Sequence, residues 1–314
     1  MTADRIPLLI DTDPGVDDAL ALLMAFNDPR FDVVGLTIAA GNVGLGHTVA
    51  NALKLCEVCG VDAPVFAGAD APLVFPARDA AYVHGRDGFG DVGYAPAARG
   101  AEAEHAALAI LRLSHAHAGR LVLVALGPLT NLALALKLDP TLPGRLARCV
   151  VMGGAVTGHG NVTPTAEFNA WFDPEAAQIV FEGFPRVELV DWEAVLRHGL
   201  DQDQAAAWMR EAGTPRAAFY EAISRHTRDW SRQRRGERWH CADALAMALA
   251  LAPEGAEPLV ERPLAVELSH GLCRGATVVD WDRRDPGRRD NAAILMAYDQ
   301  ARFEALVRGA LAAG

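Results

Sequence analysis

The chain has 314 residues, 51% of them hydrophobic, and a formal net charge of −11. A chain of this size and composition can bury a large core, and its negative charge argues against nucleic acid and anionic membranes as partners. No signal peptide precedes Ile6 and no apolar run reaches the ~18 residues of a membrane span, so a cytoplasmic location is expected.

The first predicted elements are a strand, an acidic turn and a helix between Leu8 and Leu22. An ordinary helix start would place Asp13 at the cap and Pro14 at the first helical position. Such a start does not explain why four carboxylates crowd one strand end, where their repulsion requires a cation or shared protons. Because all the donors are oxygens, we predict a hard divalent cation. The four residues are Asp11, Asp13, Asp17 and Asp18.

Downstream, apolar runs alternate with helical periodicity as far as residue 190. Strands are predicted at 32–40, 63–66, 121–125, 148–152 and 186–190, and helices at 47–59, 102–118, 128–138 and 174–182. The loop at 72–93 is too long for a simple connector and is expected to belong to the active site. A helical segment at 201–240 is expected to flank the pocket, with its aromatic residues Trp208, Tyr220 and Trp230 packed in the core.

The tail is predicted to form strands at 264–268, 276–281 and 292–297, followed by a short helix. The whole pattern predicts a single α/β domain over 1–314, with an open, mostly parallel Rossmann-like sheet and helices on both faces. Ligands bind such sheets at the carboxyl ends of the strands. Polar residues or glycines end several predicted strands there, namely Asp11 and Asp13, Asn42, Leu126 with Gly127, and Met152 with Gly153 and Gly154.

The cysteines and the one basic cluster suggest no chemistry of their own. Five cysteines without framework spacing fit a reducing compartment. Cys56 and Cys59 form a CxxC within a predicted helix, but no second pair follows to complete a zinc site. The basic stretch SRQRRGER at 231–238 is expected to be a solvated helix face or loop near a binding site.

The stretch DTDPGVDDALAL resembles the N-terminal signature of the nucleoside hydrolases of the inosine-uridine preferring type, which are Ca²⁺-dependent enzymes. Later stretches follow in the family's order over nearly the whole chain: IAAGN ending at Asn42, VHGRDGFGD from Val83, ALGPLTN from Ala125, VVMGGA from Val150, NVTPTAEFN from Asn161 and DALAMA from Asp243. The resemblance implies hydrolysis of the N-glycosidic bond of ribonucleosides to ribose and free base, in nucleoside salvage. It also implies a homodimer or homotetramer.

The resemblance assigns Ca²⁺ to Asp13, Asp18, Asp243 and the backbone carbonyl of Leu126, with the ribose 2′- and 3′-hydroxyls and one water completing the shell. Asp13 would also take a proton from that water and direct it at the anomeric carbon. The residues that resemble ribose-binding residues are Asp17, Asn42, Asn161, Glu167 and Asn169, with Met152 near the 5′ end. Without the resemblance, Asn161, Glu167 and Asn169 read as turn and capping residues. Asp11 is expected to orient its neighbours.

The leaving-group acid is the point at which the chain departs from the family. Well-known members carry a histidine directly before the third metal aspartate, whereas this chain has Ala242. His240 is one candidate, from a shifted position. Alternatively, Cys241 marks a subgroup that acts without the histidine. His84 resembles a histidine that lines the base pocket in related enzymes.

Two other functions remain open on the sequence. One is a Mg²⁺-dependent phosphatase of the haloacid-dehalogenase type, with Asp11 as nucleophile and Asp13 as acid. Pro14 and Gly15 stand against it, because that motif expects a small β-branched residue there. The other is a Ca²⁺-dependent nucleoside or ribose binder without turnover. The acidic pocket itself favours hydrolysis of nucleosides over nucleotides, because carboxylates stabilise an oxocarbenium-like transition state and repel phosphate.

Overall fold

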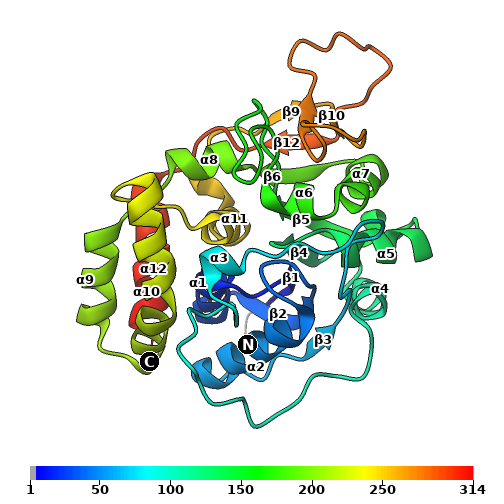
Figure 1. The fold of residues 1–314 in the computed structure, drawn as a ribbon. Coiled ribbons are helices and arrows are strands. Elements are labelled where there is room, and N and C mark those ends of the chain that lie inside the picture. The colour runs from blue at the N-terminus through cyan, green and yellow to red at the C-terminus, as the bar shows by residue number, and fades with distance from the viewer. Residues whose placement is uncertain (1–4, 314) are drawn as a thin grey trace.

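The computed structural model describes residues 5–313 and is built around an eight-stranded sheet (Figure 1). The strand order is β3-β2-β1-β4-β5-β6-β12-β9, and only β9 runs antiparallel to its neighbour. The strands of this sheet are β1 (Ile6–Thr12), β2 (Phe31–Ile38), β3 (Val65–Ala67), β4 (Leu121–Ala125), β5 (Leu146–Met152), β6 (Val187–Val190), β9 (Val260–Arg262) and β12 (Ala292–Ile294).

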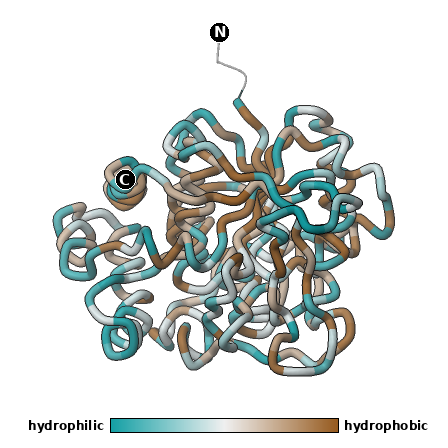
Figure 2. The backbone as a smooth tube through the Cα atoms, turned by 90° about the horizontal axis from the view of Figure 1, so that it is seen from above, coloured by the Kyte–Doolittle hydropathy of each residue, from teal (hydrophilic) through white to brown (hydrophobic). Residues whose placement is uncertain are grey.

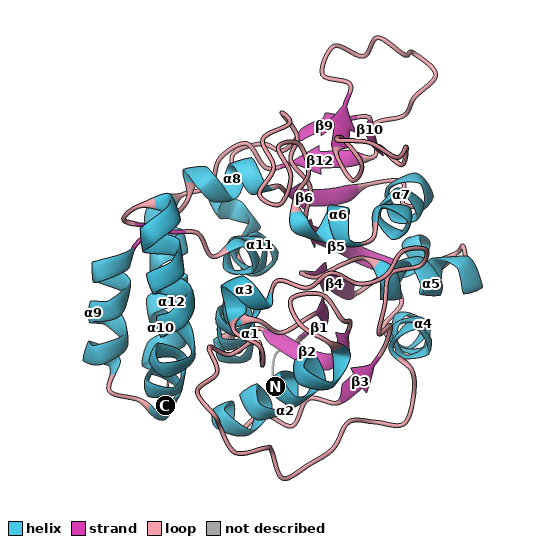
Figure 3. Cartoon of the chain, viewed as in Figure 1, coloured by secondary structure: helices cyan, strands magenta, loops and turns pink. Residues whose placement is uncertain are grey.

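Helices cover both faces of the sheet (Figure 3). One face carries α1 (Val16–Asn27), α2 (Leu45–Cys59), α11 (Ala242–Leu251) and α12 (Gln300–Ala312), and the other carries α4 (Ala106–Ala116), α5 (Thr130–Leu138) and α7 (Pro174–Gly183). The arrangement confirms the predicted open, mostly parallel sheet with helices on both faces.

Alternating side chains along each strand build the two cores. Leu8 and Ile10 of β1 pack into the cluster formed with α1 and α2, whereas Leu9 packs into the cluster formed with α4 and α5. Successive side chains of a strand point to opposite faces, so a strand buried on both faces reads as a continuous apolar run. Figure 2 shows the result, with the hydrophobic strands gathered at the centre of the molecule.

The strand order reverses between β1 and β4. The chain places β2 and β3 on one side of β1 and then returns, so that β4 pairs with the other edge of β1. At such a switch point a crevice opens beyond the carboxyl ends of the strands. Asp13 follows β1 and Leu126 follows β4, and the Leu126 N–H donates to the Asp11 carbonyl over 2.8 Å. The acidic turn therefore lies at the ligand-binding crevice.

The predicted helical segment is present as α9 (Gln202–Ala212) and α10 (Pro215–Arg235), which pack against each other and against α12. The short strands β7 (Leu200–Asp201) and β8 (Arg238–Trp239) pair at its ends. Within the described residues, no helix has both the length and the apolar composition needed to cross a membrane.

Several predicted boundaries are wrong. The helix expected from 102 begins at Ala106, because the Glu102 N–H donates to Val65 and the His105 side chain caps the helix. The strands expected in the tail, β10 (Leu264–Val266) and β11 (Thr277–Val279), pair only with each other. The helix α11 was not predicted as such, because it is buried all round and shows no amphipathic period.

The long 72–93 loop contains one short helix, α3 (Ala81–His84). Two further short helices, α6 (Phe168–Phe172) and α8 (Trp192–Arg197), follow β5 and β6. All three lie at the carboxyl ends of the strands and contribute residues to the pocket described below.

Arg148 ties β5 to β6 and to the end of α11. Its guanidinium donates to Glu188 on β6 at 2.6 Å and to the terminal α11 carbonyls of Leu249 and Ala250 at 3.0 and 2.8 Å. We expect Arg148→Met to lower the free energy of unfolding by about 2 kcal/mol, because it leaves two helix carbonyls without their donor and removes one of the two arginines that pair with Glu188, Arg186 being the other. Urea denaturation measures the change.

The matched control is Arg225→Met on the exposed face of α10, where the arginine pairs with Glu221 four residues earlier. A surface pair of this kind contributes about 0.5 kcal/mol or less. Equal losses in the two variants would contradict the assigned role of Arg148.

Candidate active site

A pocket lies at the carboxyl ends of the strands and is lined by all but two of the predicted site residues. The predicted residues that line it are Asp17, Asn42, His84, Leu126, Met152, Asn161, Glu167, Asn169, His240 and Asp243. The two others, Asp13 and Asp18, are fully buried and hydrogen-bonded to Asn42, which does line the pocket. Residues spread over the chain thus meet at one site.

The helix α1 begins later than an ordinary helix start would place it. Gly15 is its N-cap residue and Val16 its first residue, so Asp13 and Pro14 lie outside the helix. The Gly15 N–H donates to Asp18 Oδ2 over 3.0 Å, so that Asp18 caps the helix from within its first turn. Asp13 is therefore not a cap, and its carboxylate is available for another purpose.

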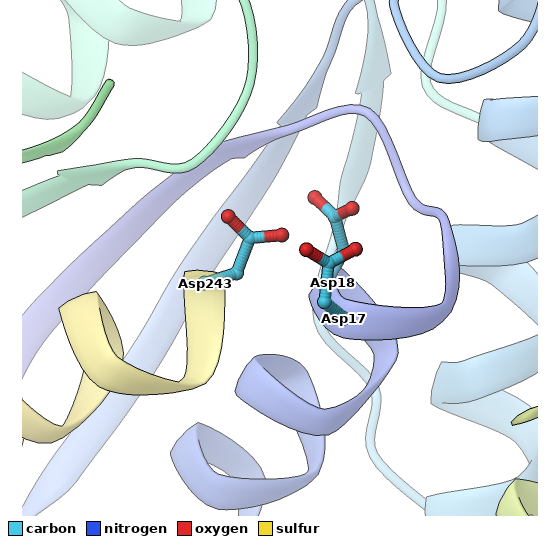
Figure 4. Close-up of side chains that lie close together, drawn as sticks. All are labelled: Asp17, Asp18 and Asp243. Carbon is cyan, nitrogen blue, oxygen red and sulfur yellow. The ribbon is translucent and has the colours of Figure 1, made fainter. Parts of the chain in front are cut away.

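Three carboxylates face one another across the crevice (Figure 4). Asp17 and Asp18 come from the first turn of α1 and Asp243 from the first turn of α11, and their ligand oxygens lie within 4.8 Å of one another. Thr12 Oγ1 and Asn42 Nδ2 both donate to Asp18 and fix its orientation.

The electrostatics of this cluster favour a bound cation. Burial raises the pKa of Asp17 to about 6, and burial together with the charges of Asp17 and Asp18 raises the pKa of Asp243 well above its usual range. Among the described residues no lysine or arginine forms an ion pair with any of the three. An all-oxygen donor set with unbalanced negative charge fits a hard divalent cation.

The Asp13 carboxylate adjoins this cluster and is enclosed by backbone. The Asn42 N–H donates to Asp13 Oδ2 over 2.6 Å. A Cβ atom at Gly41 would lie 2.1 Å from Asp13 Oδ2, and one at Gly127 would lie 2.3 Å from Oδ1. Burial, followed by the charge of Asp18, raises the Asp13 pKa well above its usual range. A buried, oriented carboxylate of high pKa is suited to accept a proton.

Asp11 has no access to the pocket. It is fully buried, and its Oδ1 accepts hydrogen bonds from Thr37 Oγ1 at 2.7 Å and Asn131 Nδ2 at 2.9 Å. Asn131 in turn accepts from the Ala69 N–H, which ties β1 to the loop after β3. This position counts against the phosphatase, because a nucleophile must touch its substrate.

The residues expected to bind ribose are capping residues as well as pocket residues. Glu167 caps α6, accepting from the Asn169 N–H at 2.9 Å and from the Gly154 N–H at 2.8 Å. Asn161 Oδ1 accepts from the Phe168 N–H over 2.9 Å. Burial raises the Glu167 pKa to about 7. The capping interpretation is therefore correct for Glu167 and Asn161, whose contacts also orient them at the pocket wall, but not for Asn169, which lies within α6 and donates to the Leu126 carbonyl.

Two asparagines hold other candidate residues through their side-chain amides. Asn42 Nδ2 donates to the Asp13 carbonyl at 3.1 Å and to Asp18 Oδ2 at 3.0 Å. Asn169 Nδ2 donates to the carbonyls of Leu126 at 2.7 Å and Met152 at 3.3 Å. Both amides thus position their neighbours from the edge of the pocket.

Both candidate histidines are neutral near neutral pH. The Val16 N–H donates to His84 Nδ1 over 3.1 Å, so the ring proton of His84 is on Nε2. Burial lowers the His84 pKa to about 4. Burial and then the charges of Arg235 and Arg238 lower the His240 pKa to about 4, and its buried Nδ1 has no partner among the described residues. Neither ring carries a positive charge that a departing base could use.

Sequence reasoning missed the aromatic and cationic part of the pocket, which is formed by Tyr82, Trp192, Thr227, Trp230, Ser231, Arg235 and Trp239. Trp208 and Tyr220 are buried as expected, but Trp230 lines the pocket, so its assignment to the core is wrong. The stretch at 231–238 does lie near a binding site, as expected. The available signal was the spacing of Thr227, Ser231 and Arg235, which puts them on one helix face.

The close approach of Gly127 to Asp13 gives a direct test of the site. We expect Gly127→Ala to displace the Asp13 carboxylate and weaken divalent-cation binding at least about tenfold, because residues that orient metal ligands have effects of this size. Isothermal titration calorimetry measures the affinity. The control is Gly46→Ala in α2, where no atom lies within 4 Å of the added Cβ. Equal affinities in the two variants would show that Asp13 is not held in this way.

The comparisons with known proteins agree with this geometry. Residues 8–305 match the family model described as "Inosine-uridine preferring nucleoside hydrolase". Uridine nucleosidase 1 of Arabidopsis thaliana is 35% identical over 291 residues, covering 89% of this chain and 84% of that protein. The pyrimidine-specific ribonucleoside hydrolase RihB of Escherichia coli O139:H28 is 34% identical, covering 97% of this chain and 96% of its own.

Solved structures extend the likeness to the fold. An inosine-guanosine nucleoside hydrolase has a TM-score of 0.91 and 32% identity, with 98% of this chain and 99% of its own covered. A plant nucleoside hydrolase, PpNRh1, has a TM-score of 0.92 and 28% identity, with 99% of this chain and 100% of its own covered. Sequence, fold and site geometry therefore lead to one conclusion: the chain belongs to the nucleoside hydrolase family, enzymes that hydrolyse the N-glycosidic bond of ribonucleosides.

Proposed function

We propose that the pocket hydrolyses ribonucleosides to ribose and free base, with Ca²⁺ as its cofactor and Asp13 as the base that activates water. The observation that supports this proposal is the set of buried carboxylates at the switch point, none of which forms an ion pair with a lysine or arginine among the described residues. The ligands proposed are Asp13, Asp18, Asp243 and the Leu126 carbonyl, with Asp17 beside them. Ca²⁺ suits such a site because it accepts more oxygen ligands and looser geometry than Mg²⁺.

When bound, the divalent cation offsets the repulsion among the carboxylates and makes a nearby water more acidic. Asp13 then takes one proton from the attacking water. The Asn42 N–H and the backbone at Gly41 and Gly127 hold the Asp13 carboxylate in position. The water oxygen bonds to the anomeric carbon, and the bonding pair of the C–N bond stays on the base nitrogen. The base takes one proton from solvent water and Asp13 returns its proton to solvent, so atoms and charge balance.

The polar lining of the pocket is proposed to bind the ribose hydroxyls. Its polar residues are Asn42, Asn161, Glu167 and Asn169, joined by Asp17 from α1, with Met152 near the 5′ end. Carboxylates near the sugar stabilise the positive charge that builds on ribose as the bond breaks. The same carboxylates would repel a phosphate group in the pocket.

Three expectations stay predictions, namely a homodimeric or homotetrameric assembly, a cytoplasmic location and a role in nucleoside salvage. Light scattering on the purified protein measures the assembly state. The leaving-group role of His84 and His240 also stays a prediction, limited by the neutrality of both rings to hydrogen-bond donation.

Metal-dependent hydrolysis is tested with a panel of inosine, adenosine, guanosine, uridine and cytidine, before and after chelation. We expect ribose release with Ca²⁺ and its loss on chelation. Asp13→Ala is expected to lower kcat by about 10³-fold, because general bases contribute on this scale. The control is Asp62→Ala, which removes a carboxylate whose side chain is 99% exposed. Binding of Ca²⁺ and ribose without any base release would favour the non-catalytic binder.

The second test concerns charge at the 5′ end. We expect kcat/KM for inosine to exceed that for inosine 5′-monophosphate by about 10²-fold, because a phosphate placed beside carboxylates costs several kcal/mol. Steady-state kinetics with both substrates measure the ratio. A ratio near one would contradict the proposed placement of the acidic residues, and phosphate release from an aryl phosphate would support the phosphatase instead.

A further inference from the structure

Arg235 ends α10 at the side of the pocket formed by aromatic residues. Its guanidinium carbon lies 4.5 Å from the Trp192 ring centroid and 5.3 Å from that of Trp230. Its side chain lines the pocket together with Tyr82 and His240. Two tryptophans thus fix the plane and position of a half-buried cation at the pocket wall.

The Arg235 guanidinium has no hydrogen-bond acceptor within residues 5–313, and no ion pair joins it there. Neighbouring arginines differ: Arg232 pairs with Asp203, and Arg238 donates to the Gly199 carbonyl. A guanidinium has five N–H donors, and leaving them unpaired away from water is costly. Such a group, held at a pocket wall, is positioned to bind an acceptor supplied by a ligand.

Arg235 is also the only arginine or lysine among the described residues that line the pocket. The charged and titratable groups that face it are Asp17, Tyr82 and His240. A base leaves with the bonding electron pair and is stabilised by a positive charge held beside it.

We propose that Arg235 binds the carbonyl oxygen of the base and stabilises the negative charge that reaches this oxygen as the C–N bond breaks. The proposal rests on the proposed nucleoside hydrolysis. Arg235 stays protonated throughout: the bonding pair delocalises from the base nitrogen onto the carbonyl oxygen, and the base then takes its proton from water. The arginine thus binds the leaving group and is not an acid.

A substrate preference follows from the donor chemistry of the guanidinium. It only donates hydrogen bonds, so it pairs with the adjacent O6 and N7 acceptors of a 6-oxopurine and with the O4 carbonyl oxygen of uracil. Adenine and cytosine present an amino donor at the corresponding ring position and leave the guanidinium unpaired there. The site should therefore prefer nucleosides with oxo bases over those with amino bases.

The test compares Arg235→Met and Arg235→Lys with inosine, adenosine and 4-nitrophenyl riboside as substrates. The nitrophenolate group leaves as a stable anion and needs little stabilisation. We expect Arg235→Met to lower kcat/KM for inosine by about 10²-fold. The inosine-to-adenosine ratio should fall by about tenfold, and 4-nitrophenyl riboside should lose much less. Arg235→Lys, which keeps the charge but not the planar fork, should lie between.

The matched control is Arg234→Met, because Arg234 also lies over the Trp230 ring, at 5.1 Å, but is exposed and does not line the pocket. Inhibition by ribose, which should be unchanged in every variant, reports that the site is folded. An equal loss on all three substrates would overturn the proposal, since it would mean that Arg235 only holds the tryptophans. Unchanged kinetics would also overturn it. Failure of the wild type to cleave any nucleoside would instead overturn the proposed function on which it rests.

Discussion

The repulsion among buried aspartates at one end of β1 is the constraint on which the rest of the site depends. Asp11, Asp13 and Asp18 are almost fully removed from solvent, and Asp243 joins them from α11. Removing a carboxylate from water is costly unless hydrogen bonds or an opposite charge compensate. The described residues supply hydrogen bonds to these groups but no ion pair with a lysine or arginine, so a bound divalent cation is well suited to supply the remaining compensation.

Each carboxylate receives its hydrogen bonds from a different part of the fold. Asp11 is bonded by Thr37 of β2 and Asn131 of α5, and Asp18 by Thr12 and Asn42. Because these donors lie on separate elements, the carboxylates are fixed only once the sheet has assembled. The same contacts separate their roles: Asp11 is enclosed in the core, whereas Asp17 and Asp243 face the pocket.

The pocket has two parts of opposite charge, and they match the polarity of the bond that breaks. Carboxylates from α1 and α11 form one part, and Arg235 with its tryptophans forms the other, close enough for the charges of Asp17 and Arg235 to interact. When a C–N glycosidic bond breaks, positive charge builds on the sugar and the electron pair moves to the base. Preorganised charges of the appropriate sign lower the barrier because they need not reorganise during the reaction. The first turns of α1 and α11 supply the carboxylates, and α8 and α10 supply the tryptophans and Arg235.

The sequence by itself determined the sheet and the position of the acidic site. The apolar runs of β1, β4 and β5 can be recognised in the sequence because a strand buried on both faces is apolar throughout. Asp13 and Asn42 follow two of the predicted strands, and parallel strands end at the same edge of the sheet, so the two residues are expected to meet there. The start of α1 at Val16 was not predictable in the same way. The helix caps at Gly15 and not at Asp13 because the Asp13 carboxylate accepts from the Asn42 N–H, while Asp18, which Asn42 also contacts, accepts from the Gly15 N–H.

Only the tertiary structure decided which charged and aromatic side chains face the pocket. Within SRQRRGER, Arg234 is exposed and Arg235 lines the site, although both are arginines on the same helix and both contact Trp230. The difference lies in Trp192, which is 43 residues before Arg235 in the chain and whose ring lies against Arg235 but not against Arg234. Local patterns reveal periodicity and capping, but a contact between distant residues is decided by how the helices pack against the sheet.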